Sequence, residues 1–171
     1  MISKPQPGEY APWSAGYIAK VPNGPILDIL EYLRDSTYSF FSRMTEEQAN
    51  YAYEPGKWTI KEVLAHMIDT ERVFSFRAFC FSRGEQQPLP GFTQDDYMRH
   101  ANIETRTIQD LADEFKVVRE SSLYIYKSLT DEQAMLIGNA SNHPVSVRAL
   151  VYMTAGHELH HLDILKERYL K

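Results

Sequence analysis

The segment Thr59-Ile-Lys-Glu-Val-Leu-Ala-His-Met-Ile68 decides the fold. A threonine followed three residues later by a glutamate is a capping box, the pattern that begins many helices. Behind it, apolar residues recur at intervals of three and four to about residue 82. We therefore expect a helix over residues 60–82 that is long enough to span the domain and carries His66 in its middle.

The same helical period returns in three further segments, residues 26–44, 107–129 and 146–169. Thr107 and Ser146 are suitable N-caps for the second and third of these helices. A short connecting helix is expected within residues 92–101, and a polar loop at residues 139–144. The chain shows neither a strand-like alternation of any length nor an internal repeat, so we expect an all-α four-helix bundle.

The beginning of the chain differs in composition from the rest. Five of the nine prolines lie in residues 1–25, which predicts an extended arm rather than a helix. Residues 26–171 are then expected to form one bundle domain. The last helix is apolar on nearly all sides, so either the bundle and the arm enclose it or its outer face meets another subunit.

Composition excludes several classes of function. The 171 residues include 18 Lys plus Arg and 23 Asp plus Glu, a net charge of −5 without a basic stripe, which argues against a nucleic-acid partner. No apolar run is long enough for a signal peptide or a membrane span. Cys80 is the single cysteine, so no internal disulfide can form, and we expect a cytoplasmic protein.

The candidate site lies in His157-Glu-Leu-His-His161. His157 and His161 are four residues apart, so they project from one face of the last helix, and that face is its apolar seam. A third imidazole, His66, has similarly apolar neighbours. Because two bundle helices could bring all three together, we expect His66, His157 and His161 to bind one divalent transition metal, Zn²⁺ or Ni²⁺, with coordination positions left open.

Other interpretations of these residues stay open. The His157 and His161 pair could simply be polar residues near a helix end, where histidine is favourable against the helix dipole. His100, His143 and His160 lack the apolar context and are interpreted as surface or supporting residues.

Two acidic residues are candidates for catalysis. Asp69 follows His66 by one turn and could accept its second N–H, and Glu158 is a candidate general base. Solvated helix surface is the alternative explanation for Asp69.

The letters His157-Glu-x-x-His161 also match the signature of zincin metalloproteases. A zincin usually takes its third ligand from downstream, but no histidine follows His161. Such proteases also need a strand to hold a peptide substrate, and none is expected here. The zincin interpretation is therefore disfavoured.

Several stretches together resemble the DinB/YfiT-like family of metalloenzymes. They are Lys57-Trp-Thr-Ile-Lys-Glu-Val-Leu-Ala-His66, Asp69, Glu71-Arg72, Ala155-Gly-His-Glu-Leu-His-His161, and the shorter matches Gly8-Glu-Tyr-Ala-Pro12, Tyr17-Ile18, Leu89-Pro-Gly-Phe92 and Pro144-Val-Ser-Val-Arg148. The resemblance covers nearly the whole chain. It implies an up-down-down-up bundle, typically a homodimer, in which His66, His157 and His161 are the ligands.

The resemblance also bears on function, since that family includes hydrolases and S-transferases that use low-molecular-weight thiols. Our leading hypothesis is a metal-dependent enzyme, hydrolase or thiol S-transferase, acting on a small electrophilic substrate. A non-catalytic metal-binding or stress-associated dimer is the alternative. A plain bundle without a metal is the third.

Overall fold

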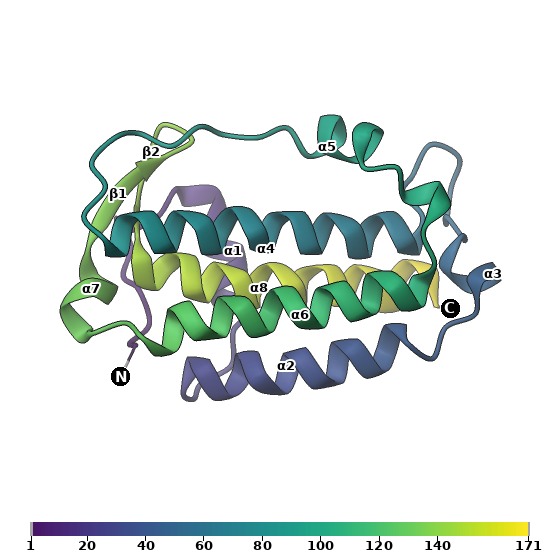
Figure 1. The fold of residues 1–171 in the computed structure, drawn as a ribbon, viewed down its shortest axis with the longest axis horizontal. Coiled ribbons are helices and arrows are strands. Elements are labelled where there is room, and N and C mark those ends of the chain that lie inside the picture. The colour runs from purple at the N-terminus through teal and green to yellow at the C-terminus, as the bar shows by residue number, and fades with distance from the viewer. Residues whose placement is uncertain (1, 171) are drawn as a thin grey trace.

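The structure is a computed structural model that describes residues 2–170. Four long helices form its body: α2 (Ile26–Phe41), α4 (Ile60–Ser82), α6 (Ile108–Lys127) and α8 (Val147–Ile164) (Figure 1). Helices α2 and α8 run in one direction, and α4 and α6 run in the other. The predicted four-helix bundle is confirmed, and its order is up-down-down-up.

A long crossover makes this order possible. After α4 ends, the chain runs back along the bundle through α5 (Gln94–His100) and the 3₁₀ turn Ile103–Thr105 before α6 begins (Figure 1). As a result α4 and α6 are parallel neighbours, α4 packs against both α6 and α8, and α2 packs mainly against α6. The second and fourth long helices, α4 and α8, therefore lie side by side although they are not consecutive in the sequence.

Side-chain caps fix the helix starts that the sequence predicts. Thr59 Oγ1 accepts a hydrogen bond from the Glu62 N–H at 3.2 Å, and the Glu62 carboxylate accepts one from the Thr59 N–H at 2.7 Å. The side chains of Thr107 and Ser146 cap α6 and α8 by accepting a hydrogen bond from the N–H three residues on. The C-terminal ends of two helices differ from the expected ones. Helix α2 ends at Phe41, before residue 44, and α8 is followed by a π-helical turn, Leu165–Tyr169.

Residues 139–144 are not the loop that the sequence predicts. Strands β1 (Ile137–Ala140) and β2 (His143–Ser146) pair antiparallel, and Ser141 and Asn142 form the turn with φ of 53° and 65°. Such a left-handed two-residue turn suits the twist of a hairpin, and Asn tolerates it better than most residues. The expectation of a chain without strands is wrong at this point. The crossover also contacts the hairpin, because the Leu89 N–H donates to the Asn139 carbonyl at 2.9 Å.

The N-terminal arm also departs from expectation, because it is not wholly extended. It contains a 3₁₀ turn, Pro12–Ser14, and a short helix, α1 (Ala15–Lys20). Helix α1 packs along α8, and Tyr152 on the outer side of α8 is buried. Of the two ways to cover α8 that the sequence left open, packing by the bundle and the arm is therefore observed.

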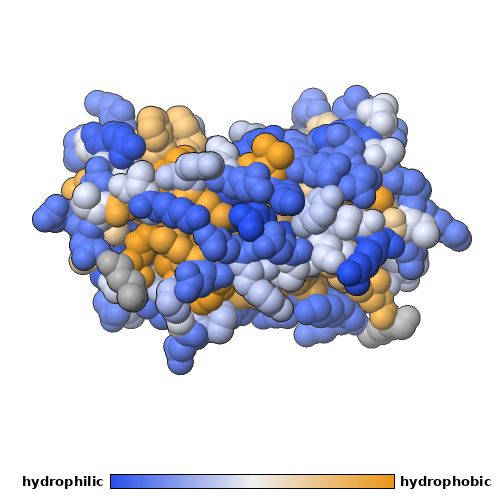
Figure 2. All heavy atoms as spheres, turned by 60° about the horizontal axis from the view of Figure 1, so that its bottom comes forward, coloured by the Kyte–Doolittle hydropathy of each residue, from blue (hydrophilic) through white to orange (hydrophobic). Residues whose placement is uncertain are grey.

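The surface is consistent with a protein that folds around one apolar core. Figure 2 shows the face on which α2 lies: most of it is hydrophilic, and apolar side chains gather toward the end where α7 (Asp131–Met135) and the hairpin lie in Figure 1. Across residues 2–170, every helix is too short or too polar to cross a lipid bilayer.

Candidate metal centre

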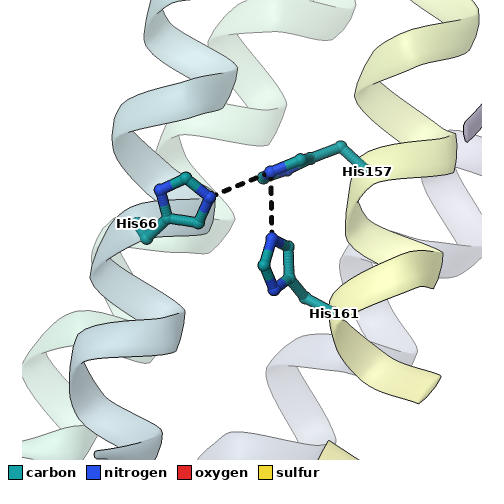
Figure 3. Close-up of side chains that lie close together, drawn as sticks. All are labelled: His66, His157 and His161. Atoms are coloured by element: carbon teal, nitrogen blue, oxygen red, sulfur yellow. Dashed lines mark hydrogen bonds between the residues drawn. The ribbon is translucent and has the colours of Figure 1, made fainter. Parts of the chain in front are cut away.

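Three histidine side chains meet between α4 and α8 (Figure 3). His66 comes from the middle of α4, while His157 and His161 come from successive turns of α8. The Nε2 atom of His157 lies 3.0 Å from that of His66 and 3.1 Å from that of His161. The three residues predicted from spacing are thus brought together, with their ligand atoms within 4.8 Å of one another.

The three imidazoles are in the neutral state that metal binding requires. Burial lowers the pKa of His66 to about 4 and that of His161 to about 3, and burial also places the pKa of His157 well below its usual value. All three rings are therefore neutral near pH 7. A neutral imidazole offers a nitrogen lone pair to a metal ion, whereas a protonated one does not.

The spacing of the nitrogens also fits a metal ion. Ligands at about 2.0–2.1 Å from a tetrahedral Zn²⁺ are about 3.3 Å apart, close to the observed 3.0 and 3.1 Å. Without a cation, three nitrogen atoms that can share few hydrogens face one another in an apolar interior, which is unfavourable. Three protein ligands would leave further coordination positions available to an ion, as in catalytic rather than structural sites.

Aromatic and polar groups surround the cluster. The centroid of the Trp58 ring lies 5.0 Å from that of the His66 ring, and the centroid of the Tyr17 ring lies 5.5 Å from that of the His157 ring. The Thr70 hydroxyl is 3.5 Å from His66 Nδ1, at the outer limit of a hydrogen bond. His66 and His157 are buried and His161 is half-buried, so the cluster meets the surface at His161.

A glycine lets the arm approach the site. A Cβ atom on Gly156 would lie 2.1 Å from the carbonyl oxygen of Tyr17, so only glycine fits between α1 and α8 at this point. The close approach at Gly156 is therefore one of backbone to backbone. It places the Tyr17 ring edge-on to His157.

Glu158, a candidate general base, is held in a buried network. Its carboxylate accepts hydrogen bonds from the Thr37 hydroxyl at 2.6 Å and from Arg119 Nη2 at 2.7 Å. Arg119 also forms a two-pronged pair with Glu71, at 2.7 and 2.8 Å. Burial raises the pKa of the Glu158 carboxyl, and the charge of Arg119 opposes this rise. Each oxygen of Glu158 accepts a hydrogen bond within the protein, and the side chain is buried.

Asp69, the other catalytic candidate, lies elsewhere. It lines a cavity of about 380 Å³ together with Arg72, Tyr97 and Glu114, and none of the three clustered histidines lines that cavity. Its carboxylate is 3.7 Å from the Arg72 guanidinium, and burial raises its pKa. The expected contact between Asp69 and the second nitrogen of His66 is not observed, because the Thr70 hydroxyl faces that nitrogen instead.

The remaining histidines are placed apart from the three ligand atoms. The His160 ring packs 5.1 Å from that of His161 and 5.3 Å from that of Tyr17, which gives it a supporting position. His100 Nδ1 lies 2.8 Å from the Asp96 carbonyl oxygen on α5. His143 is exposed in β2.

Arg119 was missed by the sequence analysis. It is completely buried and lies on the apolar seam of α6, four residues after Phe115 and three before Ser122. A charge at a seam position was the available signal, since a buried arginine needs a buried acidic partner. Glu71 and Glu158 are such partners.

Comparison with known proteins agrees with this architecture. Residues 29–165 match the family described as the DinB superfamily. Among solved structures, YfiT from Bacillus subtilis, described as a probable metal-dependent hydrolase with an unusual four-helix bundle topology, superimposes with a TM-score of 0.70. The two chains are 15% identical, over 96% of this chain and 90% of that one, so this likeness establishes the fold. No curated protein matches the sequence.

Proposed function

The chain belongs to the DinB superfamily, and from this premise we propose that it is a metal-dependent enzyme whose ion is held by His66, His157 and His161. The observation that carries the proposal is the convergence of three neutral Nε2 atoms at 3.0 and 3.1 Å in an apolar interior. The description of YfiT as metal-dependent supports the same assignment. Imidazole ligands suit Zn²⁺ or Ni²⁺.

The chemistry follows from this donor set. A divalent ion at such a site supplies Lewis acidity and lowers the pKa of a water molecule or a thiol, so that an anionic nucleophile is available at neutral pH. The protein's part is to keep the three imidazoles neutral by burial and to orient them from two rigid helices. We propose hydrolysis, or transfer of a low-molecular-weight thiol, with a small electrophilic molecule as the substrate.

The same proposal includes the setting in which the enzyme works. We propose a cytoplasmic homodimer, as the resemblance to the DinB/YfiT-like family implies. The single cysteine, Cys80, fits a reducing compartment. Because both oxygens of Glu158 accept hydrogen bonds within the protein, the proton acceptor of the reaction is proposed to be a group other than Glu158.

Metal content tests the proposal directly. Elemental analysis of the purified protein is expected to give close to one equivalent of a divalent transition metal per chain. The double variant His157→Ala/His161→Ala is expected to contain none, while its circular dichroism still shows a folded helical protein. Equal metal content in the two proteins would contradict the site.

Activity is tested next with the metal-loaded protein. One arm combines a low-molecular-weight thiol with a panel of small electrophiles, and the other offers small esters and amides to water. Turnover by the wild type that the double variant lacks would identify the reaction class. If neither arm shows turnover above the double variant, the enzymatic part of the proposal fails and the metal site remains.

One observation favours a second candidate, a non-catalytic metal-binding protein. His66 and His157 are only 2% and 6% exposed. The cavity of about 380 Å³ beside Asp69 is lined by other residues. A closed site would hold an ion without admitting a substrate. Access to the site therefore separates the two candidates.

Cobalt offers a readout of that access. The protein loaded with Co²⁺ is titrated with 2-mercaptoethanol while its visible absorption is recorded. A spectral change that saturates with thiol concentration is expected for an enzyme whose site admits small thiols. An unchanged spectrum would favour the non-catalytic candidate.

A further inference from the structure

Arg77 on α4 is a buried cation without an acidic partner. The residue is 6% exposed, and its Nη2 atom donates to the Pro90 carbonyl at 2.7 Å and to the Ser141 hydroxyl at 3.1 Å. Among residues 2–170 no carboxylate pairs with it, and its Nε and Nη1 atoms have no hydrogen-bond partner. Burial lowers the pKa of the guanidinium, which still stays charged near pH 7. An unpaired buried charge of this kind is unfavourable.

The other buried cations differ from Arg77 in this respect. Within the part of the chain that the structure describes, each of them has an acidic partner: Arg119 pairs with Glu71 and Glu158, Arg148 with Glu9, and Lys61 with Glu46. The fold therefore supplies a counter-charge to every buried cation except Arg77. A negative group from outside the chain would complete the pattern.

Arg77 lines a pocket of about 300 Å³ between α4 and the crossover that runs back along the bundle (Figure 1). The walls of this pocket are mostly apolar, and they include Val73, Phe76, Leu89, Pro90 and Phe92. Phe76 is 57% exposed, and the rings of Phe92 and Tyr97 contact each other with centroids 5.1 Å apart. Small-molecule pockets begin at about this volume. The pocket thus suits a small ligand with an apolar body.

The charges around the pocket indicate the charge of that ligand. Arg72 is the other charged residue in its described lining, and it donates to Glu114 at 2.5 Å and lies 3.7 Å from Asp69. Its charge is therefore already compensated from outside the pocket, whereas that of Arg77 is not. A group with a single negative charge balances Arg77. A carboxylate has this charge and accepts strong hydrogen bonds from a guanidinium.

The opposite side of Arg77 is too small for such a ligand. There Arg77 lines a space of about 20 Å³ together with Ser14, whose buried hydroxyl has no hydrogen-bond partner. A space of that size holds about one water molecule. An organic anion can therefore reach Arg77 only from the larger pocket.

We propose that the pocket between α4 and the crossover binds a small organic acid, with its carboxylate at Arg77 and its apolar body against Phe76 and Phe92. This site is separate from the three histidines and does not depend on the proposed function. Arg77 lies eleven positions after His66 in α4, which is about 16 Å along a helix axis. None of the three clustered histidines lines the pocket.

Isothermal titration of the purified protein with 3-phenylpropionate tests the proposal. Saturable binding at one site per chain is expected. The uncharged counterpart, 3-phenylpropan-1-ol, is expected to bind at least about tenfold more weakly, because it cannot balance the charge of Arg77. Arg77→Gln is expected to weaken binding of the acid by at least about tenfold and to leave binding of the alcohol as it is.

A pair of phenylalanine variants keeps the test decisive if Arg77→Gln does not fold. Phe76→Ala removes an exposed side chain from the pocket wall, and it is expected to weaken binding of the acid about three- to tenfold. Phe79→Ala is the matched control, since Phe79 is also on α4, is 44% exposed and does not line the pocket. It is expected to bind the acid like the wild type.

A further control separates this pocket from the metal centre, because a carboxylate can also bind a metal ion. The double variant His157→Ala/His161→Ala is expected to bind 3-phenylpropionate as the wild type does. Loss of binding in this variant would place the acid at the histidines and overturn the proposal.

Three other results would also overturn it. One is a wild type that shows no binding of the acid at about 10 mM. Another is an alcohol that binds as tightly as the acid. The third is equal binding of the acid by Phe76→Ala and Phe79→Ala.

Discussion

The Nε2 atoms of His66 and His157 lie 3.0 Å apart, although 91 positions separate the two histidines along the chain. Metal ligands must hold their distances to within about 0.2 Å. The relative position of α4 and α8 is therefore the structural property on which the proposed site depends.

The first concerns His66, the proposed ligand from α4. His66→Ala leaves only two of the three imidazoles. Losing a residue that merely hydrogen-bonds to a metal ligand weakens metal binding about 10–100-fold, and the loss of His66 is expected to weaken zinc binding by more than this. Isothermal titration with Zn²⁺ measures this, with His100→Ala on α5 as the matched control. Wild-type affinity in His66→Ala would exclude His66 as a ligand.

The second concerns the close approach of α1 to α8. Gly156→Ala would place a Cβ atom 2.1 Å from the Tyr17 carbonyl oxygen, so the two segments must separate. We expect a loss of about 1–3 kcal/mol in the free energy of unfolding, measured in urea.

Gly16→Ala on α1 is the matched control, because nothing lies within 4 Å of its Cβ. It is expected to be neutral or to stabilise by up to about 1 kcal/mol through helix propensity. Equal behaviour of the two alanine variants would contradict the packing of α1 on α8.

The third concerns the buried guanidinium. Arg119→Met leaves Glu71 and Glu158 without their cation, and breaking a buried ion pair in this way costs about 3–5 kcal/mol. Urea unfolding measures the loss. Lys127→Met is the control, because Lys127 forms an exposed pair with Glu31, and it is expected to unfold like the wild type. An Arg119→Met protein of unchanged stability would show that the network contributes nothing to folding.

The fourth concerns pH. Glu9 in the arm accepts hydrogen bonds from Arg148, at 2.7 Å from Nε, and from the Ser146 hydroxyl at 2.8 Å. The hydrogen bonds from Arg148 lower the pKa of Glu9 from 4.5 to about 2. Because the folded-state pKa lies below the unfolded one, this contribution to stability is fully present above about pH 4.5 and is lost as the pH falls toward 2.

Melting temperatures of metal-free protein between pH 3 and 6 test this. The wild type is expected to melt at higher temperature than Glu9→Gln near pH 6, and the difference is expected to shrink as the pH falls. A difference that stays constant with pH would show that the charge of Glu9 is not what fastens the arm to α8.

The sequence predicts best what is determined locally. The capping box of Thr59 and Glu62 marks the start of α4, and the spacing of His157 and His161 puts both rings on one face. Each of these signals lies within five residues. The partner His66 was found because its apolar neighbours are also local.

What the sequence could not predict depends on distant partners. Arg119 pairs with Glu71 and Glu158, which are 48 and 39 positions away, and nothing near Arg119 identifies them. The hairpin turn at Ser141 and Asn142 lacks the glycine that usually marks such a turn. Helix α1 has only six residues among prolines, and its packing on α8 depends on Gly156 far along the chain.

The crossover that makes α4 and α6 parallel has a consequence for how fast the protein reaches its native state. Neighbours in an up-down-up-down bundle are joined by short turns, whereas here residues 83–107 must first be traversed and the loop closed. Folding rates fall as the average sequence separation of contacts grows. We therefore expect this bundle to fold more slowly than antiparallel four-helix proteins of equal length, with the contact between α4 and α8 among the last to form.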